Sequence, residues 1–230
     1  MPTGRVSQQP MVRESFTIRR LPPTPGAEAS LWQFIRELCC RTGNNGYPIA
    51  SAQWDFFPRI WIDPYEKLVP EWTYIAEAEQ VVIAYLTGCP DTAKFARARF
   101  FYCTLPLLME IGCGRHRGNP DAPRFARRAL GLQKNVENCF SPEIRRQIKD
   151  RYPAHLHVNV DSPFRGMGVG RRLIESYIAD LHDIRVPGVH VYCGPDPVKF
   201  YLRLGFQELS SILFHGTEVY ALGCPCDARE

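Results

Sequence analysis

The sequence has no apolar run long enough to cross a membrane, which takes about eighteen residues or more. Its first ten residues also lack the apolar core of a signal peptide, so we expect an intracellular, cytoplasmic protein. The nine cysteines have no regular spacing, which argues against a secreted disulfide framework. Cys224 and Cys226 have no second pair or histidine nearby, so no metal site is expected. The net charge is only +4, without a long basic run, so neither nucleic acid nor a membrane is an expected partner.

The most informative segment is the glycine-rich stretch Arg165–Arg172, between a strand-like run at 155–160 and a helix-like run at 171–182. No Lys-Ser or Lys-Thr pair follows its last glycine, and its spacing is not G-x-G-x-x-G, so it is neither a Walker loop nor a dinucleotide fingerprint. Its three alternating glycines leave a turn without side chains. The following helix directs unpaired backbone N–H groups and its positive end at that turn. The pattern therefore favours a site for pyrophosphate, with a plain tight turn as the alternative.

The remaining patterns predict an α/β fold in which helices flank a mixed β-sheet. We expect a disordered lead at 1–14, a single domain at 15–223 with a helical insertion at about 91–151, and a tail at 224–230. The insertion separates the third and fourth strands. Strands are expected at 15–20, 72–78, 80–87, 155–160, 189–193, 207–214 and 218–222.

A second signature follows the glycine stretch by about thirty residues. A strand is followed by Pro195-Asp196-Pro197, which predicts a helix with Asp196 as its N-cap and Pro197 as its first residue. Phe200-Tyr201 and Gly205-Phe206 come next. With Arg165-x-x-Gly168-x-Gly170, this segment resembles the GNAT superfamily of acyl-CoA-dependent N-acyltransferases. The run Tyr152–His157 is similar to the acetyltransferase-like domain that accompanies some O-GlcNAcases, and to its stand-alone bacterial relatives.

The resemblance implies that the fourth strand and the next one splay apart, with acetyl-CoA, the acyl donor, in the gap between them. The pantetheine arm would pair with the backbone of Val158 and Val160. An amine acceptor would attack the thioester directly, without a covalent enzyme intermediate. The residues implied in pyrophosphate binding are Arg165, Gly166, Met167, Gly168, Val169, Gly170 and Arg171.

The resemblance also implies that Tyr201 is the general acid that protonates the leaving thiolate, the alternative being a tyrosine of the core. His157, on the polar face of the fourth strand, is the first candidate for general base; water or Glu77 are alternatives, and so is a structural role. Two positions depart from the pattern. Asn159 stands where the narrower relatives have Asp, and Gly194 stands where the family often has Asn.

Three functions stay open at this point. The chain is an N-acetyltransferase, a catalytically inactive GNAT-like module for acyl-CoA or protein binding, or a transferase for a longer acyl group or a hydroxyl acceptor. Two roles are equally compatible with the insertion: a lid over the acceptor site, and the surface of a homodimer.

Overall fold

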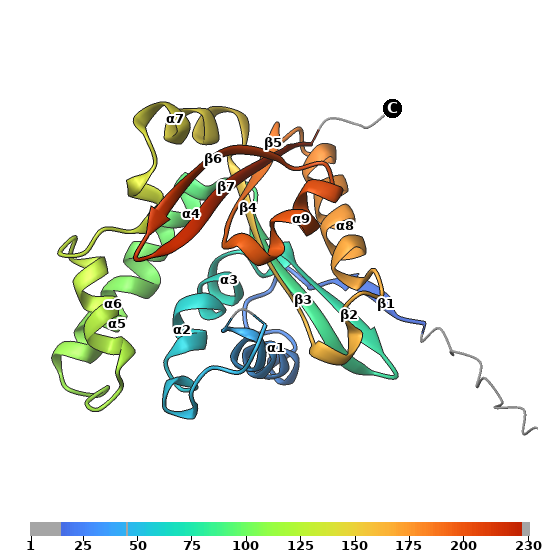
Figure 1. Ribbon diagram of the computed structural model, residues 1–230. Coiled ribbons are helices and arrows are strands. Elements are labelled where there is room, and N and C mark those ends of the chain that lie inside the picture. The colour runs from blue at the N-terminus through green and yellow to red at the C-terminus, as the bar shows by residue number, and fades with distance from the viewer. Residues whose placement is uncertain (1–14, 45, 227–230) are drawn as a thin grey trace, which may run out of the picture.

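The computed structural model describes residues 15–44 and 46–226 (Figure 1). The expected disordered lead, 1–14, lies outside the described residues. Seven strands form one mixed sheet in the order β1-β2-β3-β4-β5-β7-β6, which confirms the predicted fold class. The strands are β1 (Thr17–Arg20), β2 (Thr73–Ala78), β3 (Val81–Cys89), β4 (Ala154–Val160), β5 (Gly188–Cys193), β6 (Gln207–Phe214) and β7 (Thr217–Pro225).

Helices cover both faces of this sheet. They are α1 (Ala29–Thr42), α2 (Phe57–Trp61), α3 (Asp63–Leu68), α4 (Thr92–Arg99), α5 (Leu105–Gly112), α6 (Asp121–Ala129), α7 (Pro142–Arg151), α8 (Val169–Asp183) and α9 (Pro195–Arg203). None of the helices in the described part of the chain is both long and apolar enough to cross a membrane.

Alternation along β2 shows which helices share a face. Tyr74 and Ala76 pack in the same cluster as Leu173 of α8 and Tyr201 of α9. Ile75, between them, packs with α1. The two faces are therefore the α8–α9 face and the α1 face. Each fully buried aliphatic side chain in these clusters stabilises the fold by about 1.5–3 kcal/mol.

The insertion between β3 and β4 contains four α-helices, α4 to α7. A π-helical turn, Phe100–Thr104, joins α4 to α5. The Ser141 hydroxyl caps α7 by accepting a hydrogen bond from the backbone N–H of Ile144 at 3.3 Å.

Two boundaries differ from the sequence-based expectation. The helix α9 begins at Pro195 with Gly194 as its N-cap, so Asp196 is not the cap. Both prolines fit because the first helical turn needs no N–H groups. At the C-terminal end, β7 continues to Pro225, because it pairs with β5 along the whole of that strand. Cys224 and Cys226 are consequently buried in the core rather than placed in a tail.

Candidate functional site

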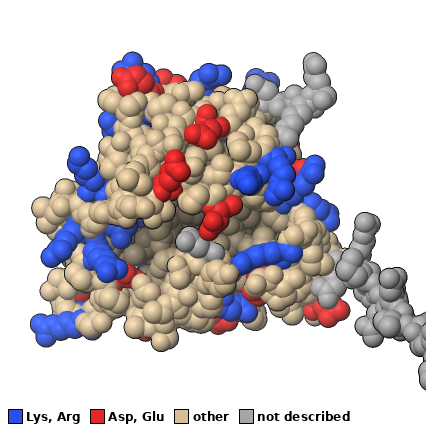
Figure 2. Space-filling view, in the orientation of Figure 1, with Lys and Arg blue, Asp and Glu red and all other residues tan. Residues whose placement is uncertain are grey.

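The site begins where β4 and β5 separate. These parallel strands pair only at Ala154 with Val189 and at His155 with His190. β4 then continues to Val160 without pairing with β5, so the two strands enclose a V-shaped opening (Figure 1). Figure 2 shows a hollow there, below the β6–β7 hairpin and above α1 and α2. The splayed strands expected from the sequence are therefore present.

The backbone of β4 presents hydrogen-bonding groups to this opening. The N–H of Asp161 donates to the Ile83 carbonyl of the β3 side at 2.8 Å. Because hydrogen-bonding groups alternate between the two edges of a strand, those of Val158 and Val160 point away from β3, toward the opening. The carbonyl of Val160 already accepts a hydrogen bond from Nε of Arg165 at 3.1 Å. The backbone N–H and C=O of Val158 and the N–H of Val160 therefore line the edge of β4 along which the pantetheine arm is expected.

The glycine stretch forms an open turn at the start of α8. Gly166 and Gly168 have φ angles of 79° and 82°, a region that favours glycine. A Cβ atom at either position would meet no atom within 4 Å, so the turn faces open space. Gly168 is the N-cap of α8, and no side chain caps this helix. The first-turn N–H groups, including those of Val169, Gly170 and Arg171, thus lack helical partners, which fits an anion such as pyrophosphate.

Gly170 has a different role from the other two glycines. A Cβ atom there would lie 3.3 Å from the Phe200 ring and 3.4 Å from Val160. This glycine therefore lets α8 approach β4 and α9 closely, next to the opening.

The arginines of the glycine stretch are engaged with the protein. Nη2 of Arg165 donates to the Gly46 carbonyl at 2.6 Å, and Nε of Arg171 donates to Glu175 at 2.7 Å. The guanidinium of Arg172 lies 4.7 Å from the ring centre of Phe16. Met167, beside them, is 42% exposed. The backbone, rather than free arginine charge, is thus the main feature of this turn.

Tyr201 lies in α9, on the α8–α9 face, with only 7% of its surface exposed. Its ring packs against Phe200 and Phe206. Burial raises the pKa of its phenol, so the group stays protonated at neutral pH, as a proton donor must. The hydroxyl makes no hydrogen bond to any residue that the structure describes, and it is not among the polar atoms sealed from solvent. It is therefore available to a ligand.

His157 lies on the α1 face, opposite Tyr201. Its ring packs edge-to-face on Trp61 of α2, with 5.1 Å between centroids. Burial, assisted by the positive charge of Arg99, lowers the pKa of His157 to about 4, so the imidazole is neutral at neutral pH. The structure does not bring His157 and Tyr201 onto one face. They lie on opposite sides of a sheet that opens between β4 and β5.

Two further residues named from the sequence, Asn159 and Glu77, make contacts within the protein. The amide of Asn159 donates a 2.6 Å hydrogen bond to the hydroxyl of the buried Tyr85, so Asn satisfies a core polar group there. Glu77, the alternative base, pairs with Arg19 at 2.9 Å. It lies on β2, which β3 separates from β4.

Sequence reasoning did not single out His155 as part of a polar network beside the site. Its Nε2 lies 2.7 Å from the Tyr65 hydroxyl, and its Nδ1 lies 2.8 Å from the Thr92 hydroxyl. The alternation His155-x-His157 places both rings on one face, but their partners come from α3 and α4, which no local pattern reveals.

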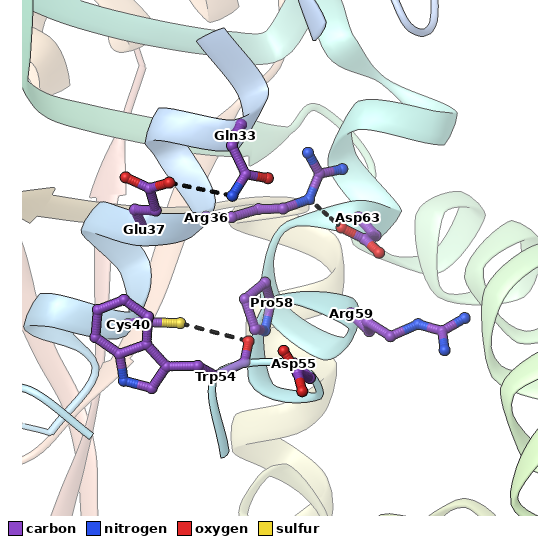
Figure 3. A pocket seen from close by; sticks show the side chains of 9 residues that line it. All are labelled: Gln33, Arg36, Glu37, Cys40, Trp54, Asp55, Pro58, Arg59 and Asp63. Carbon is purple, nitrogen blue, oxygen red and sulfur yellow. Dashed lines mark hydrogen bonds and ion pairs between the residues drawn. The ribbon is translucent and has the colours of Figure 1, made fainter. Parts of the chain in front are cut away.

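A separate cavity of about 300 Å³ lies between α1 and α2 (Figure 3). Arg36 pairs there with Asp63 at 2.8 Å, and Arg59 is bound to Glu110 outside the cavity. None of its lining residues comes from β4, β5, α8 or α9, so it is distinct from the opening. The lining residues are Gln33, Arg36, Glu37, Cys40, Trp54, Asp55, Pro58, Arg59 and Asp63.

No protein-family model matches the sequence. Among solved structures, SsHAT is 27% identical with a TM-score of 0.69, and the match covers 93% of this chain and 100% of SsHAT. An N-acetyltransferase from Staphylococcus aureus Mu50 is 10% identical with a TM-score of 0.53, over 93% and 99% of the two chains.

A polyamine N-acetyltransferase from Drosophila melanogaster is 14% identical with a TM-score of 0.53, over 92% and 100%. GNAT enzymes of this kind use acetyl-CoA as the acetyl donor. The splayed β4 and β5, the uncapped glycine turn and these similarities agree: the chain has the fold of the GNAT N-acetyltransferases and is similar to SsHAT over nearly its whole length.

Proposed function

We propose that the protein is an N-acetyltransferase that transfers an acetyl group from acetyl-CoA to an amine. The observation that carries this proposal is the V-shaped opening, which has an uncapped helix N-terminus at its rim and an unpaired strand edge along one side. The backbone N–H groups from Gly168 to Arg171 would hold the pyrophosphate, and Val158 would pair with the pantetheine arm. When bound, acetyl-CoA supplies the thioester carbon that the amine attacks.

Two side chains, one on each side of the opening, carry out the proton transfers. Tyr201 donates its phenolic proton to the sulfur that leaves as a thiolate. His157 accepts a proton from the attacking nitrogen. Its pKa of about 4 makes it a weak base, so it acts once the N–C bond is forming and the nitrogen has become acidic.

The test is the melting temperature in the presence of acetyl-CoA, with free CoA and ATP as controls. A ligand at one hundred times its dissociation constant adds about 2.7 kcal/mol to the free energy of unfolding. We expect acetyl-CoA and CoA to raise the melting temperature and ATP to leave it unchanged. No shift with either coenzyme would refute the site.

One observation favours a second candidate, an inactive acyl-CoA-binding module. Asn159 occupies a position where the narrower relatives have a carboxylate, and its amide is committed to Tyr85. This candidate predicts the same shift with acetyl-CoA but no release of CoA with any amine. The thiol released from acetyl-CoA during turnover therefore separates the two functions.

A further inference from the structure

The helical segment 92–134 of the insertion carries a positive charge that the rest of the chain does not share. It contains nine Lys and Arg residues but only two Asp and Glu residues, a net charge of +7. The remainder, with nineteen basic and twenty-two acidic residues, has a net charge of −3. The value of +4 for the whole chain therefore conceals a separation of charge. Figure 2 shows Lys and Arg side chains gathered along the flank that α5 and α6 form, at the left of the view.

Both acidic side chains of this segment are already paired. Glu110 accepts hydrogen bonds from both terminal nitrogens of Arg59, at 2.6 and 3.0 Å. Asp121 accepts a hydrogen bond from Gln53 at 2.6 Å and lies 3.8 Å from Arg124. The carboxylates of the segment are thus satisfied within the protein and leave its other basic side chains uncompensated.

Two of these basic side chains, Arg127 and Arg128, are exposed at the end of α6. Neither side chain makes a hydrogen bond or an ion pair with any residue in 15–44 or 46–226. The apolar side of α6, with Ala122 and Phe125, packs against Leu107 of α5. The two arginines lie on the solvent side of the helix, where they can meet a partner.

Large apolar side chains are exposed in the same segment. Leu130 and Leu132, which directly follow the two arginines and the end of α6, are 63% and 76% exposed. Phe101, in the π-helical turn, and Leu105, the first residue of α5, are 58% and 42% exposed. Monomeric proteins rarely leave a patch of large apolar side chains open to water, so such a patch marks a binding surface.

The start of α5 and the end of α6 lie side by side. Cys103 and Thr104, in the turn before α5, line one crevice together with Phe125 of α6. The loop 113–120 joins the two helices at their other ends (Figure 1). The exposed apolar and basic side chains therefore gather at one end of the helix pair. We call this the α5–α6 surface; it consists of Phe101, Leu105, Arg127, Arg128, Leu130 and Leu132.

We propose that the α5–α6 surface docks on a membrane surface that contains anionic lipids. Arginines beside leucine and phenylalanine match the boundary of such a bilayer, where negatively charged headgroups meet the acyl chains. Nucleic acid offers phosphates and stacking bases, which would use the arginines and Phe101 but not the aliphatic Leu130 and Leu132. The combination of charge and aliphatic side chains therefore favours lipid.

Docking in this way leaves the opening between β4 and β5 accessible. The α5–α6 surface lies at the edge of the molecule away from α8 and α9, which border the opening (Figure 1). The inference goes beyond the proposed function and does not depend on it.

The test is co-sedimentation of the full chain with vesicles of phosphatidylcholine that contain about 30% phosphatidylserine, with pure phosphatidylcholine vesicles as the reference. We expect binding to the anionic vesicles only, and weaker binding in about 0.5 M salt, which screens charge. The double variant Arg127→Gln and Arg128→Gln should bind at least about ten-fold more weakly, since one basic residue near an anionic surface contributes about five-fold. The matched control is Arg145→Gln with Arg146→Gln, which removes two adjacent exposed arginines from α7 and should bind nearly as the wild type does.

The apolar part of the surface is tested with the double variant Leu130→Ser and Leu132→Ser. We expect it to bind anionic vesicles about ten-fold more weakly, because it loses apolar area that the bilayer buries. Its control is Leu213→Ser, on β6, where the leucine is 78% exposed. All of these variants should melt at the temperature of the wild type, because the replaced side chains are exposed.

Four results would overturn the inference. Two of them are a failure to bind the anionic vesicles and equal binding to both kinds of vesicle. The third is an equal loss of binding in the two arginine double variants, which would mean that the position of the charge is unimportant. The fourth is a different occupant: tighter binding to a short RNA duplex than to the vesicles, or a dimer that the leucine double variant dissociates.

Discussion

At the scale of single residues, the chemistry depends on which groups burial keeps neutral. Tyr201 and His157 are both held in the uncharged form, and for both of them burial is the largest cause. A neutral phenol can give a proton and a neutral imidazole can accept one, so each group has the protonation state that its proposed role requires.

Replacement of Tyr201 by Phe removes the phenolic proton and keeps the ring that packs on Phe200 and Phe206. We expect kcat to fall about a hundred-fold or more, the usual contribution of a general acid, with an unchanged dissociation constant for acetyl-CoA. Steady-state kinetics and calorimetric titration measure the two quantities.

Tyr220→Phe is the matched control, because the hydroxyl of that tyrosine donates a hydrogen bond to Glu218 and has no part in the proposed chemistry. Full turnover in Tyr201→Phe would remove Tyr201 from the mechanism.

At the scale of elements, α8 has two functions. Its length packs against the sheet, and its first turn is proposed to bind the pyrophosphate. Its stripe of Leu173, Ile174, Tyr177 and Leu181 is fully buried, so the helix is fixed against the sheet while its N-terminus stays open. A rigid helix directs its N–H groups at a ligand without further ordering, which keeps the entropic cost of binding low.

Two substitutions of Gly168, by Asp and by Asn, test this arrangement because they differ in charge alone. Asp and Asn both tolerate the left-handed conformation of this position and have nearly the same size. We expect Gly168→Asp to weaken CoA binding at least ten-fold more than Gly168→Asn, because only Asp places a negative charge beside the pyrophosphate. Calorimetric titration with CoA gives both affinities, and equal values would show that no phosphate binds at this turn.

Elements with strong local patterns could be predicted from the sequence. β6 occupies 207–214 as expected, and α8, Val169–Asp183, agrees with the helix-like run predicted at 171–182 to within about two residues at each end. The helices of the insertion were harder to predict from the sequence. α6 contains four arginine or proline positions among its nine residues, and its apolar side packs only on the small cluster around Phe56 and Leu107. The contact between Phe140 and Tyr192 could not be found from the sequence, because the two residues lie about fifty positions apart.

At the scale of the whole molecule, three histidines with lowered pKa values make the fold sensitive to acid. Burial lowers the pKa values of His155, His157 and His190. The unfolded chain has histidine pKa values of about 6.5, so below that pH it binds more protons than the folded protein. The free energy of unfolding is unaffected by these groups above about pH 6.5 and decreases as the pH falls; for His157 the decrease continues to about pH 4.

We therefore expect His157→Gln to lose less stability between pH 6.5 and 4.5 than the wild type, since it lacks one of the three groups. Urea unfolding at a series of pH values measures this difference. His182→Gln, at an exposed position on α8, is the control and should follow the wild type. Parallel curves for the wild type and His157→Gln would mean that His157 does not titrate abnormally.

The opening between β4 and β5 also bears on self-association. An unpaired strand edge is a template on which another chain can add a strand and begin to aggregate. Here the unpaired edge of β4 lies inside the sheet, and the strands are joined at Ala154 and His155, which close the narrow end of the V. A foreign strand has no room to extend past that junction, so the protein can leave hydrogen-bonding groups available to a slender ligand without offering them to its own copies.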